Sequence, residues 1–310
     1  MSSSNPTPAR GRAGFTVVEL MVALVITGLL TTVIWQLVRT QSRFVAFEAQ
    51  REDAQSNGRA ALDIIAGDVR AALPQGIITA SDNVLVLALP KAWGVLCAAS
   101  TATTFTAAFP TMGPDAFIVL ANDGTGVVVN TSATSTPSWA PRPALDNTRA
   151  RVTSIAAANA AASCPTASGT VSAYTVTGSN FPVAAAGTLV SLYQLVRYDV
   201  GQSDNKWWVR RSNGLSGANA FSMVPLAGPI PAADSVRFTY YSGAAGTLVN
   251  PAPGNTTATL DLLSRIKLKV TTVSSGAYGG TSTRNRDSAT ILLRNRVRAL
   301  TCAQGAPAPC

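Results

Sequence analysis

GFTVVELMVALVITGLLTTVIWQLV, residues 14–38, is an apolar run that begins abruptly after a polar and basic N-terminus. The 19 residues from Leu20 to Val38 contain no charged side chain. As a helix they would be about 28 Å long, enough to cross the hydrocarbon core of a bilayer. A polar, arginine-containing segment follows in place of the small-residue cleavage site of a secretory signal, so we expect the run to be retained.

Glu19 is the one charged residue near the start of this run. A carboxylate held at bilayer depth costs about 2.5–3.5 kcal/mol. Glu19 therefore either extends to the membrane interface or needs a cationic partner.

The composition argues against catalysis. The chain has 310 residues, 47% hydrophobic and 13% charged, and it contains no histidine. This excludes Ser-His-Asp and Cys-His catalytic groups and histidine-containing zinc sites. No phosphate-binding loop of the form G-x-x-x-x-G-K-[ST] occurs either. We expect no enzyme, and no catalytic, cofactor-binding or metal-binding residue.

The four cysteines are Cys97, Cys164, Cys302 and Cys310, with no C-x-x-C pair among them. They permit three disulfide pairings. We favour Cys302 with Cys310, because the short segment between them is rich in Gly and Pro, and this leaves Cys97 with Cys164. Disulfides require an oxidising compartment, so this interpretation places the C-terminal part of the chain outside the cytoplasm. The alternative is four buried thiols.

Residues 14–24 resemble the prepilin motif of type IV pilins and type II secretion pseudopilins. The matching features are a basic leader, Gly14, Phe15, and Glu19 at the fifth position after Gly14. The resemblance implies that prepilin peptidase removes residues 1–14, cutting between Gly14 and Phe15, and N-methylates Phe15. Loss of Arg10 and Arg12 would lower the formal net charge from +9 to +7.

The resemblance also implies a role for Glu19. Cleavage creates a cationic amine on Phe15, and in an apolar helical bundle an unpaired charge is costly. Glu19 of one subunit would pair with the amine of a neighbour and so direct assembly. The implied partners are other minor and major pilins, prepilin peptidase, the inner-membrane assembly platform and, before assembly, membrane lipid. We expect a single-pass protein of the inner membrane with its C-terminal head outside the cytoplasm, and later a place in a pilus at the cell surface.

The helix is predicted to continue to Leu73, before Pro74, as a membrane or fibre-core half (residues 15–38) and an amphipathic half (residues 39–73). Gly28 and Gly58 are either positions where the helix can bend or melt locally, or sites of close helix packing. Apolar or small residues spaced by three, four and seven positions mark one face. They are Phe44, Phe47, Ala54, Ala61, Leu62, Ile65, Val69 and Leu73.

Residues 74–310 are predicted to form a β-rich head, because short β-like runs alternate with Gly, Pro, Ser and Asn. Strict alternation over residues 265–270 indicates antiparallel strands with one solvated face. Residues 130–188 are predicted to be long loops and weak edge strands, an inserted subdomain covering one side of the sheet. The overall class is α+β, a long helix packed on an antiparallel sheet as in the type IV pilin fold. The expected strands are residues 84–89, 116–120, 126–129, 189–198, 206–211, 235–241, 263–272 and 289–300.

Two further segments, residues 61–70 and 289–296, resemble PilW-type minor pilins and the related pseudopilin J of type II secretion. The chain is far longer than a major pilin, which favours a minor subunit. The resemblance thus implies a minor pilin that primes or caps a type IV pilus. The alternatives are a pseudopilin at the tip of a secretion pseudopilus and a minor pilin that binds DNA for uptake.

Two basic groups are candidates for such DNA binding. The first group recurs at every second position, the spacing of side chains on one face of a strand, and consists of Arg294, Arg296 and Arg298. Arg210 and Arg211 follow Lys206 and two tryptophans at 207 and 208. Cations can hold a phosphate backbone and aromatic rings can stack on bases. The alternative for both groups is a solvated strand face, beside core tryptophans in the second.

Overall fold

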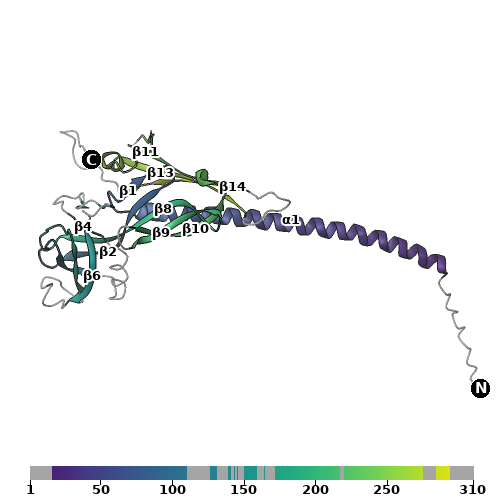
Figure 1. The fold of residues 1–310 in the computed structure, drawn as a ribbon, viewed down its shortest axis with the longest axis horizontal. Coiled ribbons are helices and arrows are strands. Elements are labelled where there is room, and N and C mark those ends of the chain that lie inside the picture. Colours follow the sequence, from purple (N-terminus) through teal and green to yellow (C-terminus); the bar gives the residue numbers. More distant parts are fainter. Residues whose placement is uncertain are drawn as a thin grey trace, which may run out of the picture. The chain divides into compact units, whose positions relative to one another are not determined.

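The computed structural model describes residues 16–109, 126–130, 139–140, 143, 145, 150–158, 164, 172–216, 220–243, 245–274 and 284–293. The chain divides into two compact units, residues 1–50 and 51–310. The predicted combination of a long N-terminal helix and antiparallel sheets is confirmed, and the head is rich in sheet (Figure 1).

Helix α1 (Val17–Ala71) has 55 residues. It ends before the expected Leu73, because the residue ahead of a proline is disfavoured in helical geometry and Pro74 follows. In the first unit the described side chains from Thr16 to Val45 are all exposed. Phe44 and Phe47, which were expected on the packed face, are 65% and 42% exposed. This part of the prediction is therefore wrong for the single, unassembled chain.

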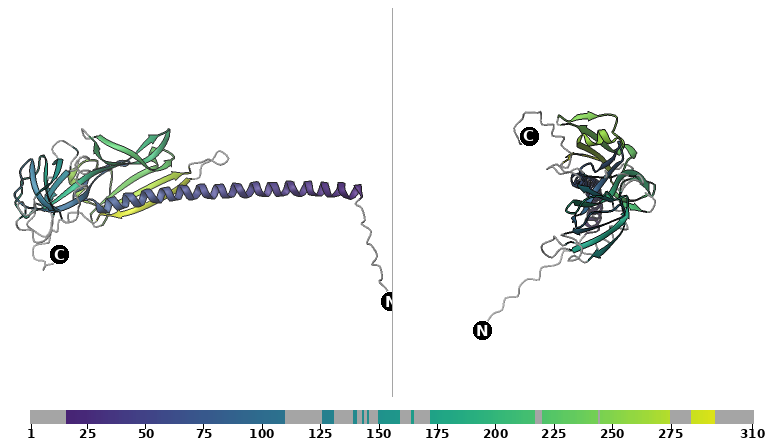
Figure 2. Two further views of the ribbon diagram at one scale, coloured as in Figure 1. Left: turned by 90° about the horizontal axis from the view of Figure 1, so that it is seen from below. Right: turned by 90° about the vertical axis from the view of Figure 1, so that its left-hand side faces the viewer.

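In the second unit, α1 buries one face at intervals of three and four residues, as predicted. A single hydrophobic cluster joins this face to two sheets, and Ile65 of this cluster is fully buried. Figure 2 shows β14 (Arg284–Leu292) running beside the C-terminal part of α1, where Arg59 lies 4.0 Å from Asp287. The buried residues of α1 are Ala54, Gly58, Ala61, Leu62, Ile65, Ala66 and Val69.

The larger sheet is antiparallel throughout, in the order β1-β2-β3-β7-β6-β4-β8-β9-β10, with β5 paired to β4. Its strands are β1 (Ile77–Ala80), β2 (Leu85–Leu96), β3 (Thr104–Phe109), β4 (Gly126–Asn130), β5 (Trp139–Ala140), β6 (Arg151–Ala158), β7 (Ser172–Ser179), β8 (Leu189–Ser203), β9 (Lys206–Ser216) and β10 (Ala220–Ile230).

Six of these strands close into a ring, because β2 also pairs with β8. The ring β2-β3-β7-β6-β4-β8 encloses its own core of Phe105, Phe109, Tyr174, Val176 and neighbouring side chains. For the described residues of the range 130–188, this corrects the interpretation as loops and weak edge strands. β6 and β7 are interior strands of the ring, and they contribute Val152, Tyr174 and Val176 to its core, whereas their Ser and Thr residues are exposed or half-buried.

The ring is continuous with the rest of the sheet and does not lie over it as a separate subdomain. Leu85 and Leu87 of β2 belong to the core under α1, whereas Ala92 and Leu96 of the same strand lie in the ring core. β8 is shared in the same way, with Leu192 in the ring and further residues under the helix.

The second sheet has four strands in the order β12-β11-β13-β14. They are β11 (Val236–Ser242), β12 (Thr247–Val249), β13 (Leu263–Val273) and β14, accompanied by the short helices η1 (Ala233–Ser235) and α4 (Thr257–Asp261). The alternation predicted over residues 265–270 is confirmed, with Ile266, Leu268 and Val270 buried.

Most of the expected strands are observed, several of them longer than expected. β14 begins at Arg284, five positions before the expected start at residue 289. Residues 284–288 are all polar, so no apolar alternation marks this part of the strand in the sequence. The expected strand at 116–120, and the part of the last strand beyond Leu293, lie outside the described residues.

Candidate functional site

The N-terminal part of α1 presents an apolar surface that the first unit leaves uncovered. An 18-residue window has a mean hydropathy of 2.4 with no residue buried, which is long and apolar enough to cross a membrane. Val17 is 75% exposed and Leu24 is 68% exposed. An exposed apolar surface of this size is typical of contact with a membrane or with other proteins.

Thr16 and Glu19 form a reciprocal capping arrangement at the start of this surface. The backbone N–H of Thr16 donates to Glu19 Oε2 at 3.2 Å, and the backbone N–H of Glu19 donates to Thr16 Oγ1 at 3.3 Å. The first helical hydrogen bond, from Leu20 N–H to the Thr16 carbonyl, is 3.2 Å long. This is a capping box, which satisfies two backbone donors that the helix itself leaves unpaired.

The capping box engages only one oxygen of the Glu19 carboxylate. The Thr16 hydroxyl also donates to Oε2, at 3.3 Å. Among the described residues no hydrogen bond is made to the other oxygen, Oε1. The carboxylate therefore fixes the helix start and keeps an acceptor for a further donor. Gly14 and Phe15, the expected cleavage and methylation residues, lie outside the described residues.

An aromatic and cationic pair lies near the other end of the apolar run. The Arg39 guanidinium carbon is 5.2 Å from the centre of the Trp35 ring, one helical turn away. Trp and Arg side chains are typical of the boundary between hydrocarbon and water. The pair flanks residue 38, the predicted end of the membrane segment.

In the second unit, α1 is tied to β8 and β9 by a polar cluster of Asp68, Tyr198 and Arg211. The Tyr198 hydroxyl donates to Asp68 Oδ2, and one terminal nitrogen of Arg211 donates to the same oxygen at 2.9 Å. Arg211 Nε also donates to the Tyr198 oxygen at 3.0 Å. Burial, followed by the hydrogen bond and negative charge of Asp68, raises the pKa of Tyr198.

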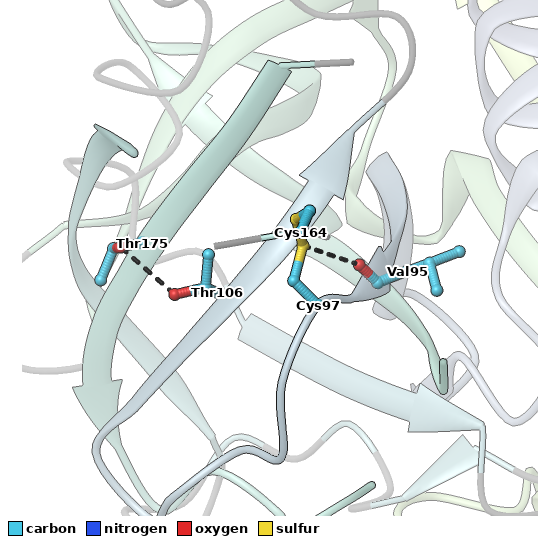
Figure 3. The surroundings of a disulfide bond; sticks show 5 residues. All are labelled: Val95, Cys97, Thr106, Cys164 and Thr175. Atoms are coloured by element: carbon cyan, nitrogen blue, oxygen red, sulfur yellow. Dashed lines mark hydrogen bonds between the residues drawn. A yellow bond between two sulfur atoms is a disulfide. The ribbon is translucent and has the colours of Figure 1, made fainter. Parts of the chain in front are cut away.

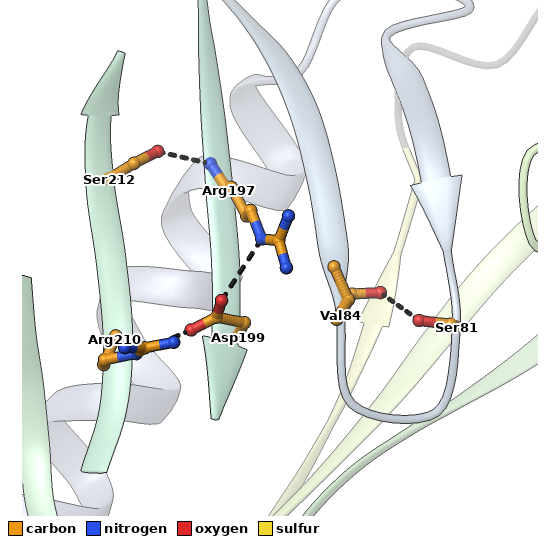
Figure 4. A network of polar contacts seen from close by, with 6 residues as sticks. All are labelled: Ser81, Val84, Arg197, Asp199, Arg210 and Ser212. Atoms are coloured by element: carbon orange, nitrogen blue, oxygen red, sulfur yellow. Dashed lines mark hydrogen bonds and ion pairs between the residues drawn. The ribbon is translucent and has the colours of Figure 1, made fainter. Parts of the chain in front are cut away.

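Arg210 points to the opposite face of the sheet from Arg211, as alternation along β9 requires. Its Nε donates to Asp199 Oδ1 at 2.9 Å, and Arg197 Nε donates to Asp199 Oδ2 at 3.2 Å (Figure 4). Arg210 and Arg211 are therefore paired with different carboxylates on different faces.

The two tryptophans beside these arginines also have internal roles. Trp207 packs against the main core, and Trp208 Nε1 donates to the Ser203 carbonyl at 3.1 Å. Residues 206–211 thus do not form one continuous basic surface with stacking rings. Arg294, Arg296 and Arg298 lie outside the described residues.

Cys97 and Cys164 are joined in a disulfide with a Cα–Cα distance of 4.6 Å (Figure 3). The bond ties the residue just after β2 to a position 67 residues further along the chain. Next to it, the hydroxyls of Thr106 and Thr175 are 3.3 Å apart and link β3 to β7. Cys302 and Cys310 lie outside the described residues.

Sequence reasoning missed two features of these sites. The capping role of Thr16 has a local signal, the pattern T-x-x-E immediately ahead of an apolar run. The cluster at Asp68 has no local signal, because 130 residues separate it from Tyr198.

Comparison with known proteins gives one family match. The family model for the prokaryotic N-terminal methylation motif matches residues 9–35. No curated protein matches the chain, and no solved structure matches it either. The exposed apolar helix is consistent with membrane anchoring. The chain therefore carries a prepilin-type methylation motif at the start of a helix able to cross a membrane, which supports a type IV pilin-like protein.

Proposed function

We propose that this protein is a minor pilin, cleaved after Gly14 and N-methylated on Phe15, that joins other pilins to prime or cap a type IV pilus. The observation that carries the proposal is the uncovered apolar helix that begins at a Thr16–Glu19 capping box. A surface of this kind is stable in lipid before assembly and between the helices of other subunits after it.

Glu19 is the assembly determinant in this proposal. Its Oε2 is engaged by Thr16, so the capping box holds the carboxylate close to the helix start. The new amine of a neighbouring subunit's Phe15 would donate to the same carboxylate. Pairing in an apolar bundle removes the cost of two isolated charges and fixes the axial position of one helix against the next.

Mass spectrometry of the N-terminus tests the processing step. In cells with prepilin peptidase we expect a chain that begins with methylated Phe15, and in cells without it an uncut chain that begins at or near Met1. A cut at another position, or an uncut chain in the wild-type strain, overturns the proposal.

Incorporation into filaments tests the role of Glu19. We expect Glu19→Ala to abolish incorporation while the protein remains in the membrane. Glu48→Ala removes an exposed carboxylate from the same helix and serves as the matched control, with incorporation retained. Equal incorporation of wild type and Glu19→Ala contradicts the proposal.

A pseudopilin at the tip of a secretion pseudopilus is the alternative within the same class, and the motif at residues 9–35 supports it equally. A deletion strain separates the two. Loss of twitching or DNA uptake with normal secretion supports a pilus subunit, whereas loss of exoprotein secretion alone supports a pseudopilin.

A further inference from the structure

The outer face of the four-stranded sheet gathers the cations of three neighbouring strands. Alternation along β13 buries Ile266, Leu268 and Val270 and turns the residues between them outward. The outward cations are Arg237 on β11, Arg265, Lys267 and Lys269 on β13, and Arg284 and Arg286 on β14. Asp287, the one acidic residue of β14, lies on the other face and pairs with Arg59 of α1.

The strand register arranges these cations as a track, which we call the basic track: Arg265, Lys267, Lys269, Arg286 and Arg284. The first three follow one another on β13. Arg286 is opposite Thr271 and Arg284 is opposite Val273, so the track continues along β14 beyond Lys269. The rows from residue 265 to residue 273 span about 27 Å at about 3.4 Å per residue.

Most of the charges on the track are not neutralised within the described part of the chain. Lys267, Lys269, Arg284 and Arg286 are exposed, and no described carboxylate pairs with them. Arg237, beside the track, is paired with Asp82 at 3.3 Å, but both side chains are more than half exposed. Residues 275–283 and 294–310, which flank β14 in sequence, contain no acidic residue and three further arginines.

One cross-strand pair on this face works against stability. Lys269 lies directly opposite Arg237, and like charges in this position destabilise a sheet. Asp82 pairs with Arg237, whereas no described carboxylate pairs with Lys269, whose charge is therefore open to an anionic partner.

We infer that the basic track binds the phosphate backbone of a nucleic-acid duplex. A row of charges along one direction fits a linear polyanion better than the plane of a membrane. Hydroxyls of Thr239, Ser288 and Thr290 lie on the same face beside Lys267 and Lys269 and can donate to phosphate oxygens.

Among the described residues, this face lacks the row of aromatic rings on which the bases of a single strand stack. The aromatic residue that β11, β13 and β14 place on this face is Tyr241, and the Arg265 guanidinium lies 5.5 Å from its ring centre. Base stacking on aromatic rings supplies much of the affinity for single strands. The described face therefore favours sequence-independent contact with duplex phosphates.

This inference does not depend on the assembly role of α1, because it concerns a face of the second unit and different residues. It also does not use Arg210 and Arg211, two of the DNA-binding residues expected from sequence, which pair with Asp199 and Asp68.

The test is fluorescence anisotropy with the full chain in non-ionic detergent and a labelled DNA duplex of about 30 base pairs, over a series of salt concentrations. For four or five phosphate contacts we expect log K to fall with log salt with a slope of about −4. The variant Lys267→Ala with Lys269→Ala should bind about tenfold more weakly at low salt, with a slope shallower by about 2. The matched control is Lys91→Ala with Lys206→Ala, which removes the same charge from exposed strand positions of the larger sheet.

The control separates the track from general charge. Binding within about twofold of wild type for the control and loss for the track variant supports the inference. Equal loss in both variants, no salt dependence or no duplex binding overturns it. Tighter binding to a single strand of equal length, or track-dependent binding to phosphatidylglycerol vesicles without DNA binding, also overturns it. Thermal unfolding of each variant checks that the fold is intact.

Discussion

The Tyr198 hydroxyl donates to Asp68, joining β8 of the larger sheet to the last turn of α1 across 130 residues of sequence. Arg211 binds both groups and completes the cluster. Within the second unit, these three side chains therefore connect the last turn of α1 to β8 and β9.

The first prediction concerns this cluster. Asp68→Ala leaves Arg211, which is 22% exposed, without its carboxylate, and should lower the free energy of unfolding by about 2–3 kcal/mol. Tyr198→Phe removes two hydrogen bonds, the one donated to Asp68 and the one accepted from Arg211, and should cost about 1–2 kcal/mol. Urea unfolding of the full chain in detergent measures both. Asp63→Ala, an exposed acid on the same helix, should change little, and equal loss at Asp63 would argue against the cluster.

The second prediction concerns alkaline pH. Burial, followed by Asp68, raises the pKa of Tyr198, and burial, followed by Asp82, raises the pKa of Tyr240 above the ordinary value near 10. A raised pKa in the folded state stabilises the protein below the unfolded pKa, and this contribution is lost as pH rises above about 10. We expect stability to fall in that range, and less steeply in Tyr198→Phe. A tyrosinate absorbance titration in which all six tyrosines ionise near pH 10 without unfolding would contradict this.

The third prediction concerns glycines. A Cβ added at Gly126 would lie 2.1 Å from Cζ of Tyr193, so Gly126→Ala should destabilise the six-stranded ring by about 1–3 kcal/mol. Gly67→Ala is the matched control on α1, where nothing lies within 4 Å, and it should stabilise by up to about 1 kcal/mol. If Gly126→Ala and Gly67→Ala change the thermal midpoint equally, the contact with Tyr193 does not destabilise the Gly126→Ala variant.

Gly58 is an intermediate case. Its added Cβ would meet Thr272 Oγ1 at 3.4 Å, an ordinary contact, while Thr272 Oγ1 donates to the Ala54 carbonyl. The structure therefore supports close packing at Gly58, whereas at Gly28 the space is open.

The fourth prediction separates the two roles of Glu19. Glu19→Gln keeps an oxygen for the capping box but loses the charge, and Thr16→Ala removes the side-chain half of the box but keeps the charge. If charge pairing drives assembly, Glu19→Gln should fail to enter filaments and Thr16→Ala should enter with a modest decrease. Quantification of each variant in sheared filaments measures this. The reverse order would assign Glu19 to helix capping alone.

The sequence was informative where the signal is local. The apolar run, the alternation in β13 and the end of α1 near Pro74 each depend on residues within a few positions of one another. For the described part of residues 130–188 the interpretation was wrong, because no local signal marks these strands. β6 and β7 contain few large side chains, and their interior position comes from pairing with β3 and β4.

Amino-acid order alone determined that this chain begins with a prepilin-type motif and a helix apolar enough for a membrane, because periodicity and composition act over short distances. Only the tertiary structure decided that β2 and β8 close a six-stranded ring, that Arg210 and Arg211 turn to opposite faces toward separate carboxylates, and that cations from three strands share one face. These relationships depend on strand register, which joins residues far apart in sequence and leaves no local pattern.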